Sequence, residues 1–280
     1  EFSSYEDDKF FEKTVSHKKY SAIFIDEVQD YTTEWLRIVM QNFLIDPNGE
    51  LVVFGDPKQN VYHRPLDKNG DIRLGVIGGV WNRQLTTSRR FTNPRLANLA
   101  MAFQKQFMSS QHADEIAIDN VKETSLNFQI LNYIDMRSNC SLDALVENIT
   151  NIISNDNNAT RDFVVLASTT KLLRNIDFRY RQLTQKQTEI TFVSTEVLDR
   201  LKKIHNVIDE GTANWKFHRD FEALERTRKR LFTTDKRCLK ISTIQSFKGW
   251  DLPSVIVVLE NDFISKETNF DPMSPQAVYT

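Results

Sequence analysis

Cysteine is scarce in this sequence of 280 residues, where Cys140 and Cys238 stand far apart and neither belongs to a Cys-x-x-Cys motif. Two isolated cysteines argue against a disulfide scaffold and against a zinc site, because both need grouped ligands. We expect both to be small buried hydrophobic residues in a reducing, cytoplasmic setting. Glycine and proline are also few, with 8 and 7 residues, so collagen-like and low-complexity chains are excluded.

Long apolar runs are absent as well. The longest uninterrupted aliphatic run is Val255–Leu259, and the first ten residues, EFSSYEDDKF, are acidic and have no apolar centre. A membrane-spanning helix needs about 20 apolar residues, so we predict neither a membrane span nor an export signal. An excess of one charge is lacking too, because 36 Lys and Arg against 38 Asp and Glu give a net charge of −2. Any contact with nucleic acid must therefore use a local basic surface.

The sequence does contain short apolar runs that alternate with helical patterns, which is typical of an α/β protein with a largely parallel sheet. The expected strands are Ala22–Ile25, Leu51–Phe54, Phe128–Leu131, Phe163–Ala167, Ile190–Val193, Leu239–Ile241 and Val255–Leu259. Several are apolar at every position, as expected of strands that helices cover on both faces. The expected helices are Thr33–Leu44, Asn93–Phe107, Leu142–Ile153, Lys171–Leu183, Glu196–Ile208 and Phe217–Phe232.

A domain boundary is predicted near residue 88, where the glycine-rich stretch GVIGGVWNRQ gives way to a polar run and then to a helix that begins near Pro94. The first domain would cover residues 1–88 and the second residues 89–280. Residues 195–236 show helical patterns without a strand, which predicts a small helical insertion in the second domain.

Two carboxylates, Asp26 and Glu27, directly follow the apolar run Ala22–Ile25. They are expected at the carboxyl edge of the sheet, where open α/β sheets bind ligands. This is the pattern of a Walker B element, in which Asp26 can hold Mg²⁺ while Glu27 polarises the water that attacks a phosphoryl group. Alternatively, one of the two carboxylates caps the helix that follows.

A second strand end is polar in the same way, because the run Leu51–Phe54 leads into GDPKQ at residues 55–59. Taken alone, GDPKQ is a turn sequence. Adjacent parallel strands end at one edge, so Gln29 and Gln59 are predicted to contact a phosphate, a metal-bound water or each other.

Together, DEVQD at residues 26–30 and GDPKQ resemble motifs II and III of the UvrD/Rep-like superfamily 1 helicases. Two later segments continue the resemblance in order: LTTSRRFTNP at residues 85–94 is similar to motif IV, and ISTIQSFKGWDLP at residues 241–253 is similar to motif V. The resemblance implies two P-loop NTPase (RecA-like) motor lobes with largely parallel sheets. Such lobes bind ATP and Mg²⁺ between them and move along single-stranded DNA, with RNA left open.

The resemblance also implies roles for single residues. In motif IV, Arg90 is implied to reach the γ-phosphate. In motif V, the turn at Lys248 and Gly249 can approach a phosphate closely, and Asp251 can accept a hydrogen bond from a ribose hydroxyl. The residues implied to be catalytic are Asp26, Glu27, Gln59 and Arg90. Those implied to hold the nucleotide are Asp26, Gln29, Gln59, Arg90, Gly249 and Asp251, and those implied to touch nucleic acid are Tyr62, Thr243, Gln245 and Lys248.

The sequence departs from the family pattern in several places. Motif V has Gln245 where histidine is common and Trp250 where leucine is common, and Tyr62 lacks its usual aromatic and Arg-Gly neighbours, so Tyr62 is alternatively a core residue. No G-x-x-x-x-G-K-[ST] occurs, and with it the usual cradle for the nucleotide's phosphates is missing. Residues 276–280, QAVYT, resemble only the opening of motif VI. We therefore expect a central-to-C-terminal piece of a motor ATPase that is inactive alone.

Three alternatives stay open. The helix expected at Phe217–Phe232 carries a basic face that either follows phosphates or is simply solvated. That face comprises Arg226, Arg228, Lys229 and Arg230, opposite an apolar stripe of Phe217, Phe221, Leu224 and Leu231. The whole chain could instead be a catalytically inert module that binds a protein partner. It could also be a metal-dependent nuclease with Asp26, Glu27 and Asp56 as ligands.

Overall fold

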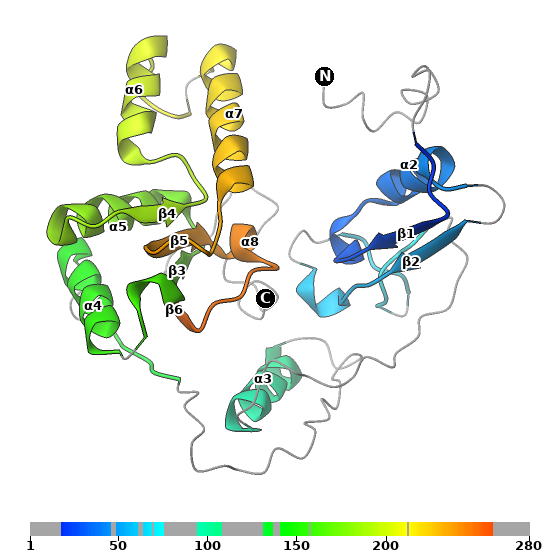
Figure 1. The fold of residues 1–280 in the computed structure, drawn as a ribbon, viewed down its shortest axis with the longest axis horizontal. Helices are drawn as coiled ribbons and strands as arrows, with labels where there is room; N and C mark the ends of the chain where they lie inside the picture. Colours follow the sequence, from blue (N-terminus) through cyan, green and yellow to red (C-terminus); the bar gives the residue numbers. More distant parts are fainter. Residues whose placement is uncertain are drawn as a thin grey trace. The chain divides into compact units, whose positions relative to one another are not determined.

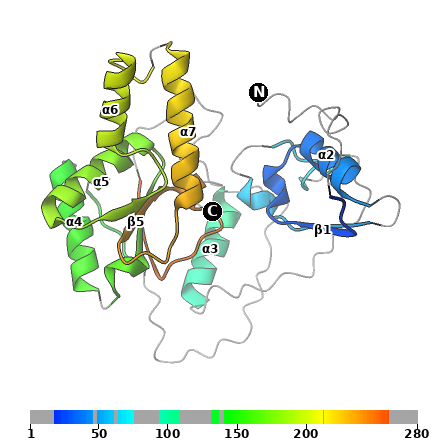
Figure 2. The same cartoon turned by 45° about the horizontal axis from the view of Figure 1, so that its top comes forward.

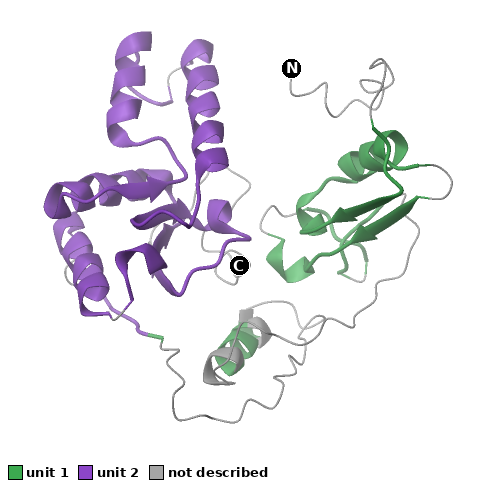
Figure 3. Cartoon of the chain, in the orientation of Figure 1, with its two compact units in different colours: residues 1–131, 265–280 green, residues 132–264 purple. Residues whose placement is uncertain are grey.

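The computed structural model describes residues 18–45, 49–60, 64–68, 70–75, 94–107, 131–136, 141–156, 158–211 and 213–259. The chain divides into two compact units, residues 1–131 with 265–280 and residues 132–264 (Figure 3). The predicted boundary near residue 88 lies outside the described residues and stays a prediction. The fold is a mixture of α and β structure with parallel sheets, as the alternation of apolar runs and helical patterns predicts.

The first unit is built on two parallel strands, β1 (Ala22–Ile25) and β2 (Glu50–Val53), with Ala22 opposite Glu50 and Ile25 opposite Val53. Helix α2 (Thr33–Phe43) makes the connection between them. It begins where the Thr32 hydroxyl accepts a hydrogen bond from the Trp35 backbone N–H at 3.3 Å. Leu36 of α2 is buried against residues of both strand ends in one apolar cluster. This unit also contains α3 (Pro94–Phe107), close to the predicted range.

The second unit contains a four-stranded sheet in the order β4-β5-β3-β6, with every pair parallel. The strands are β3 (Phe163–Ala167), β4 (Thr188–Ile190), β5 (Leu239–Thr243) and β6 (Ser254–Val258). Helices α4 (Leu142–Asn155) and α5 (Thr170–Thr184) pack on the sheet through one continuous apolar core. All five residues of β3 are buried, as expected for a central parallel strand.

Two helices, α6 (Thr195–His205) and α7 (Trp215–Leu231), lie side by side and extend away from this sheet (Figures 1 and 2). They share a small core that includes Leu198, Leu201 and Phe217. The predicted helical segment at residues 195–236 is therefore confirmed. After β5 the chain forms the single-turn helix α8 (Ile244–Phe247).

Some local predictions were wrong. Strand β4 ends at Ile190, because Phe192 and Val193 leave the sheet and bury their side chains in two different apolar clusters. Strand β6 lies at the edge of the sheet with alternating exposure, so coverage on both faces does not hold for it. Phe24 of β1 is likewise 67% exposed. Most of the expected strand at 128–131 lies outside the described residues.

Leu231 does not continue the apolar stripe of α7, since its side chain is exposed. In the part of the chain that the structure describes, no helix is both long enough and apolar enough to cross a bilayer.

Candidate functional site

The carboxyl ends of β1 and β2 bring the two acidic sequence motifs together. Beyond the paired strands, the Phe54 N–H donates to the Ile25 carbonyl at 2.8 Å, and the Val28 N–H donates to the Phe54 carbonyl at 2.9 Å. The strand ladder thus continues into DEVQD on one side and GDPKQ on the other. The predicted meeting of these two motifs at one edge of the sheet is confirmed.

Gln29 is the residue that joins the two motifs. Its side chain is only 1% exposed, and its Oε1 accepts a hydrogen bond from the Asp56 backbone N–H at 3.1 Å. Because that N–H can only donate, the amide oxygen of Gln29 must face it, and the amide nitrogen then donates to Oε2 of Glu27. The buried Gln29 therefore orients the Glu27 carboxylate through a hydrogen bond, and its own amide is not presented at the surface.

Asp56 organises the second motif around the same point. Its Oδ1 accepts from the Lys58 N–H at 2.9 Å, and its Oδ2 accepts from Nε2 of Gln59 at 3.2 Å. Gln29 and Gln59 are linked through Asp56, because each makes a hydrogen bond with it. The resulting hydrogen-bonded series runs from Glu27 through Gln29 and Asp56 to Gln59.

Glu27 has an unusual backbone conformation, with φ 53° and ψ 42° in the left-handed region. Two other non-glycine residues of the described chain have positive φ, and both Gln185 and Asn206 end helices, where this conformation is common. Glu27 ends no helix. A left-handed residue with a side chain costs about 1 kcal/mol or more, and such residues gather at functional sites.

Neither carboxylate caps α2. Glu27 stands at the N-cap position of the 3-10 turn Val28–Asp30, but its side chain makes no capping hydrogen bond there. Thr32 caps α2, while Oδ1 of Asp26 accepts a hydrogen bond from the neighbouring Glu27 N–H at 2.9 Å. Asp26 is exposed and Glu27 is half-buried. This arrangement suits a division of roles in which the exposed carboxylate binds a cation and the half-buried one accepts a proton from water.

Gly55 permits the close approach of the two motifs. A Cβ atom at this position would lie 2.7 Å from Oε1 of Gln29, 2.7 Å from Cδ1 of Ile72 and 2.8 Å from Cγ1 of Val28. These separations are shorter than any carbon contact allows, so a side chain at residue 55 would push Gln29 or the strand end away.

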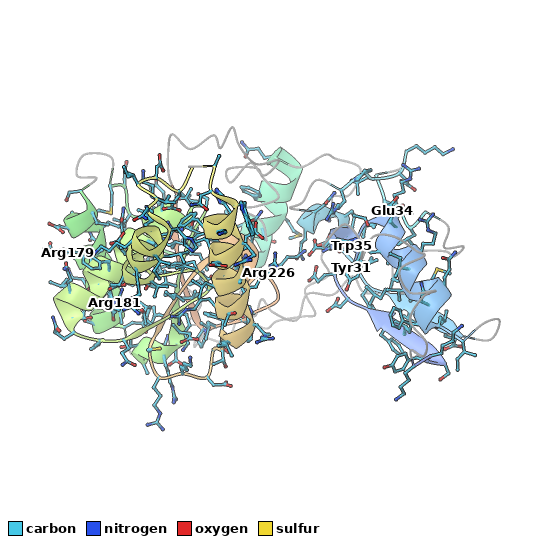
Figure 4. The ribbon with its side chains drawn as sticks, turned by 90° about the horizontal axis from the view of Figure 1, so that it is seen from above. Tyr31, Glu34, Trp35, Arg179, Arg181 and Arg226 are labelled. Atoms are coloured by element: carbon cyan, nitrogen blue, oxygen red, sulfur yellow. The ribbon has the colours of Figure 1, made fainter. Side chains whose placement is uncertain are left out.

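A cleft of about 380 Å³ lies beside this edge, lined partly by Gln29, Tyr31, Glu34 and Arg64. The Arg64 guanidinium lies 5.5 Å from the ring centre of Trp35, and its Nε donates to the Asp30 carbonyl at 3.3 Å. Tyr31 and Trp35 meet edge to face with ring centres 6.0 Å apart (Figure 4). Our sequence predictions missed this cleft, although an aromatic pair at i and i+4 directly after DEVQD was a usable signal.

The second unit gathers the motif V residues in one loop at the carboxyl end of β5. Oγ1 of Thr243 accepts a hydrogen bond from the Ser246 N–H at 3.1 Å, which starts α8. The Trp250 N–H donates to the Phe247 carbonyl at 2.9 Å, and Gly249 has φ 85° in this turn. Gln245 and Lys248 are half-buried, whereas Gly249 and Asp251 are exposed.

Some predicted site residues cannot be placed in this way. Arg90 and Tyr62 lie outside the described residues, as do the rest of motif IV up to residue 93 and residues 276–280. Within the described ranges, no three side chains of His, Cys, Asp or Glu are grouped closely enough to hold a metal ion. Asp26, Glu27 and Asp56 therefore do not form the ligand set that the nuclease alternative requires.

Comparison with known proteins gives no identification: no protein-family model matches this chain, and no curated protein matches it.

Proposed function

We propose that this chain forms part of an ATP-dependent DNA helicase or translocase of the UvrD/Rep-like superfamily 1. In such a motor, ATP hydrolysis between two RecA-like domains drives movement along single-stranded DNA. The observation that carries the proposal is the hydrogen bond from the Asp56 N–H to Oε1 of Gln29 at 3.1 Å, which joins DEVQD and GDPKQ at the carboxyl edge of two adjacent parallel strands. That edge is where α/β proteins of this type bind nucleotides.

The residues at this edge fit Mg²⁺ and a nucleotide triphosphate. Mg²⁺ prefers one or two carboxylates together with phosphate oxygens and water, and the exposed Asp26 offers one such carboxylate. The bound ion would neutralise charge on the phosphates. The Glu27 carboxylate, oriented by Gln29, would accept a proton from the attacking water, and Gln59 would orient polar groups near the phosphates. A phosphate-binding loop, which these 280 residues do not contain, would complete the site.

The remaining predicted contacts keep their proposed roles. Arg90 would meet the γ-phosphate, and Gly249 and Asp251 would contact the nucleotide from the motif V loop. Thr243, Gln245 and Lys248, with Tyr62, would contact the nucleic acid. The strained backbone of Glu27 favours a working site over an inert module, because left-handed residues that do not end a helix gather at functional sites.

The proposal is tested by Mg²⁺-dependent nucleotide binding in a chain that also carries a phosphate-binding loop. Asp26→Asn should weaken Mg·ATP binding and reduce its dependence on Mg²⁺, because a hard anionic ligand is lost. Glu50→Gln, which neutralises an exposed carboxylate at the start of β2, away from GDPKQ, serves as the matched control and should bind like the unmodified chain. Equal Mg²⁺ dependence in Asp26→Asn and Glu50→Gln would show that the metal site has been placed wrongly.

A further inference from the structure

The C-terminal end of α7 and the loop that follows α8 meet in an aromatic contact. Phe232, the residue directly after α7, is buried, and its ring centre lies 5.5 Å from that of Trp250 and 6.5 Å from that of Phe247. Phe232 also packs against Ile244 and Val164 in one apolar cluster. The C-terminal end of α7 thus lies next to α8 and the loop after it within the second unit (Figure 1).

Three unneutralised cations stand at this end of α7. Arg228, Lys229 and Arg230 are exposed in the last turn of the helix, and none makes an ion pair or hydrogen bond within the described residues. Arg226, one turn earlier, differs because it pairs with Glu222 at 2.9 Å. At a rise of about 1.5 Å per residue, the three cations lie within about 6 Å of Phe232 along the helix axis. Arg228 and Lys229, four and three residues before Phe232, lie on its side of the helix, whereas Arg230 projects to the other side.

Trp250 adds an aromatic surface beside these charges. It is 40% exposed although Phe232 packs against it, so part of the indole faces solvent. The neighbouring Gly249 is open, since a Cβ atom there would meet nothing within 4 Å. Lys248 lies in the same turn. A solvent-facing aromatic ring, an open backbone and a group of cations are the components of sites that bind single-stranded nucleic acid.

We propose that Trp250, Lys248 and the two cations Arg228 and Lys229 form one binding surface for single-stranded nucleic acid, which we call the α7–α8 surface. A base stacks on the exposed part of Trp250, and the cations of α7 contact the phosphates that flank it. The contact is tolerant of sequence, since every base has a stacking face and phosphates carry no sequence information. This inference rests on the proposed function, because it adds contacts to the nucleic-acid strand that the motor would follow.

The test is the affinity of the purified 280-residue chain for a fluorescein-labelled single-stranded oligothymidylate, measured by anisotropy at several salt concentrations. Trp250→Leu keeps an apolar side chain against Phe232 but removes the aromatic face. We expect it to weaken binding about tenfold, within the range measured for loss of a base–aromatic contact. Trp250→Phe should restore most of the affinity, because a phenyl ring still stacks.

The charge contribution is tested by the double variant Arg228→Gln, Lys229→Gln. Each lost phosphate contact lowers the slope of log affinity against log salt by about 0.7 on a single strand, so the slope should fall by about 1.4. Binding at low salt should be weaker for all sequences alike. Thermal unfolding of each variant checks that the fold is kept.

The opposite end of α7 provides a matched control. Trp215 is 65% exposed there, with Lys216 and Arg219 within 5.8 Å and 5.2 Å of its ring centre. Trp215→Leu and the double variant Lys216→Gln, Arg219→Gln remove the same kinds of group from the same helix. Both should leave the affinity and the salt slope unchanged.

The outcomes separate this inference from the proposed function. Binding that depends on Lys248 but not on Trp250 or the α7 cations overturns the α7–α8 surface alone. Binding that depends on all of them, in a protein whose Mg·ATP binding ignores Asp26, keeps the surface and overturns the motor. The inference is contradicted if variants at the two ends of α7 lose equal affinity, or if the unmodified chain does not bind the oligonucleotide. It is also contradicted if the variants of the α7–α8 surface lose binding to anionic lipid vesicles while their DNA affinity is unchanged.

Discussion

Glu27 combines two features: a left-handed backbone and a carboxylate that accepts a hydrogen bond from the buried Gln29 side chain. Glycine adopts this conformation without steric cost, whereas any residue with a Cβ atom is strained there. Glu27 thus carries a side chain at a position where the backbone conformation favours glycine. This is the pattern expected where function and stability make different demands on one residue.

The backbone strain predicts an inverted order of stability among variants of Glu27. Glu27→Gly and Glu27→Ala both remove the carboxylate, but Glu27→Gly should be more stable to unfolding by about 1 kcal/mol. In α2, Glu34→Ala should instead be more stable than Glu34→Gly by about 1 kcal/mol, because alanine is the better helix former. Urea unfolding of the four variants measures both differences, and the same order at both positions would contradict the left-handed assignment.

Gly55 yields a second prediction at this scale. Gly55→Ala should destabilise the chain by about 1–3 kcal/mol, because the new methyl group overlaps Oε1 of Gln29 and Cδ1 of Ile72. The displacement of Gln29 should also weaken Mg·ATP binding where a phosphate-binding loop is present. Gly211→Ala is the control, since a Cβ atom there meets nothing within 4 Å and the stability should hardly change.

At the scale of single elements, an ion network that begins at one buried carboxylate ties α5 to β4 and α6. Asp177 of α5 is fully buried and accepts hydrogen bonds from Arg181 and from the Thr188 hydroxyl. Arg181 in turn binds Glu196 of α6 through both of its terminal nitrogens, at 2.8 Å and 3.0 Å. The hydrogen bond from Arg181 lowers the pKa of Glu196 to about 2 and raises the pKa of Arg181.

The lowered pKa of Glu196 predicts part of the acid sensitivity of the second unit. A carboxylate whose pKa is depressed from 4.5 to about 2 stabilises the fold above pH 4.5, and this contribution is lost as the pH falls towards 2. Because Glu196 is partly exposed, solvent screening limits the effect to about 1 kcal/mol. Glu196→Gln should therefore lose stability at neutral pH and show a flatter stability profile below pH 4.5.

Urea unfolding at a series of pH values measures this profile. Glu222→Gln removes a carboxylate from an exposed pair within α7, which contributes only a few tenths of a kcal/mol, and it controls for the loss of charge. An unchanged pH profile of stability in Glu196→Gln would mean that the ion pair between α5 and α6 does not contribute to the stability of the fold in solution.

Much of the element pattern could be predicted from the sequence, because apolar runs of four or five residues and helical spacing carry it. The ranges of β1 and β3 match the predictions fully. The end of β4 could not be predicted, since Phe192 and Val193 continue the strand pattern while their side chains are buried in two separate apolar clusters beyond the sheet pairing. What ends the strand is packing against other elements, which the local sequence does not encode.

The same division applies to the candidate site. The proximity of DEVQD and GDPKQ could be predicted, because parallel strands end at one edge of a sheet. The burial of Gln29, its bond to Asp56 and the left-handed Glu27 could not, since each depends on the three-dimensional contact between segments 27 residues apart. The contact of Trp250 with Phe232 was hidden for the same reason.

At the scale of the whole molecule, both units place their polar motifs in the same way. Each has parallel strands whose carboxyl ends lead into the predicted functional residues, after β1 and β2 in one unit and after β5 in the other. The central claim of a motor ATPase requires that these motifs act on one nucleotide and one nucleic-acid strand. The sequence has no G-x-x-x-x-G-K-[ST] loop, and this lack bears directly on the binding and hydrolysis of the nucleotide.

The purified 280-residue chain should therefore show no appreciable ATP hydrolysis, with or without single-stranded DNA. It has no lysine of the phosphate-binding loop and no glycine-rich nest to position the β- and γ-phosphates, on which phosphoryl transfer depends. A phosphate-release assay at saturating Mg·ATP measures the rate. Robust DNA-stimulated hydrolysis that survives purification to homogeneity would place the nucleotide site elsewhere in the chain.

The most direct measurement of the central claim is the DNA-stimulated ATPase rate of Glu27→Gln in a chain that also carries the phosphate-binding loop. Glutamine keeps the shape of the side chain but cannot accept a proton from water. Turnover should fall by about 100-fold or more, in line with the loss of a general base, while Mg·ATP still binds. Hydrolysis by Glu27→Gln at the unmodified rate would contradict the assignment of DEVQD as the catalytic motif.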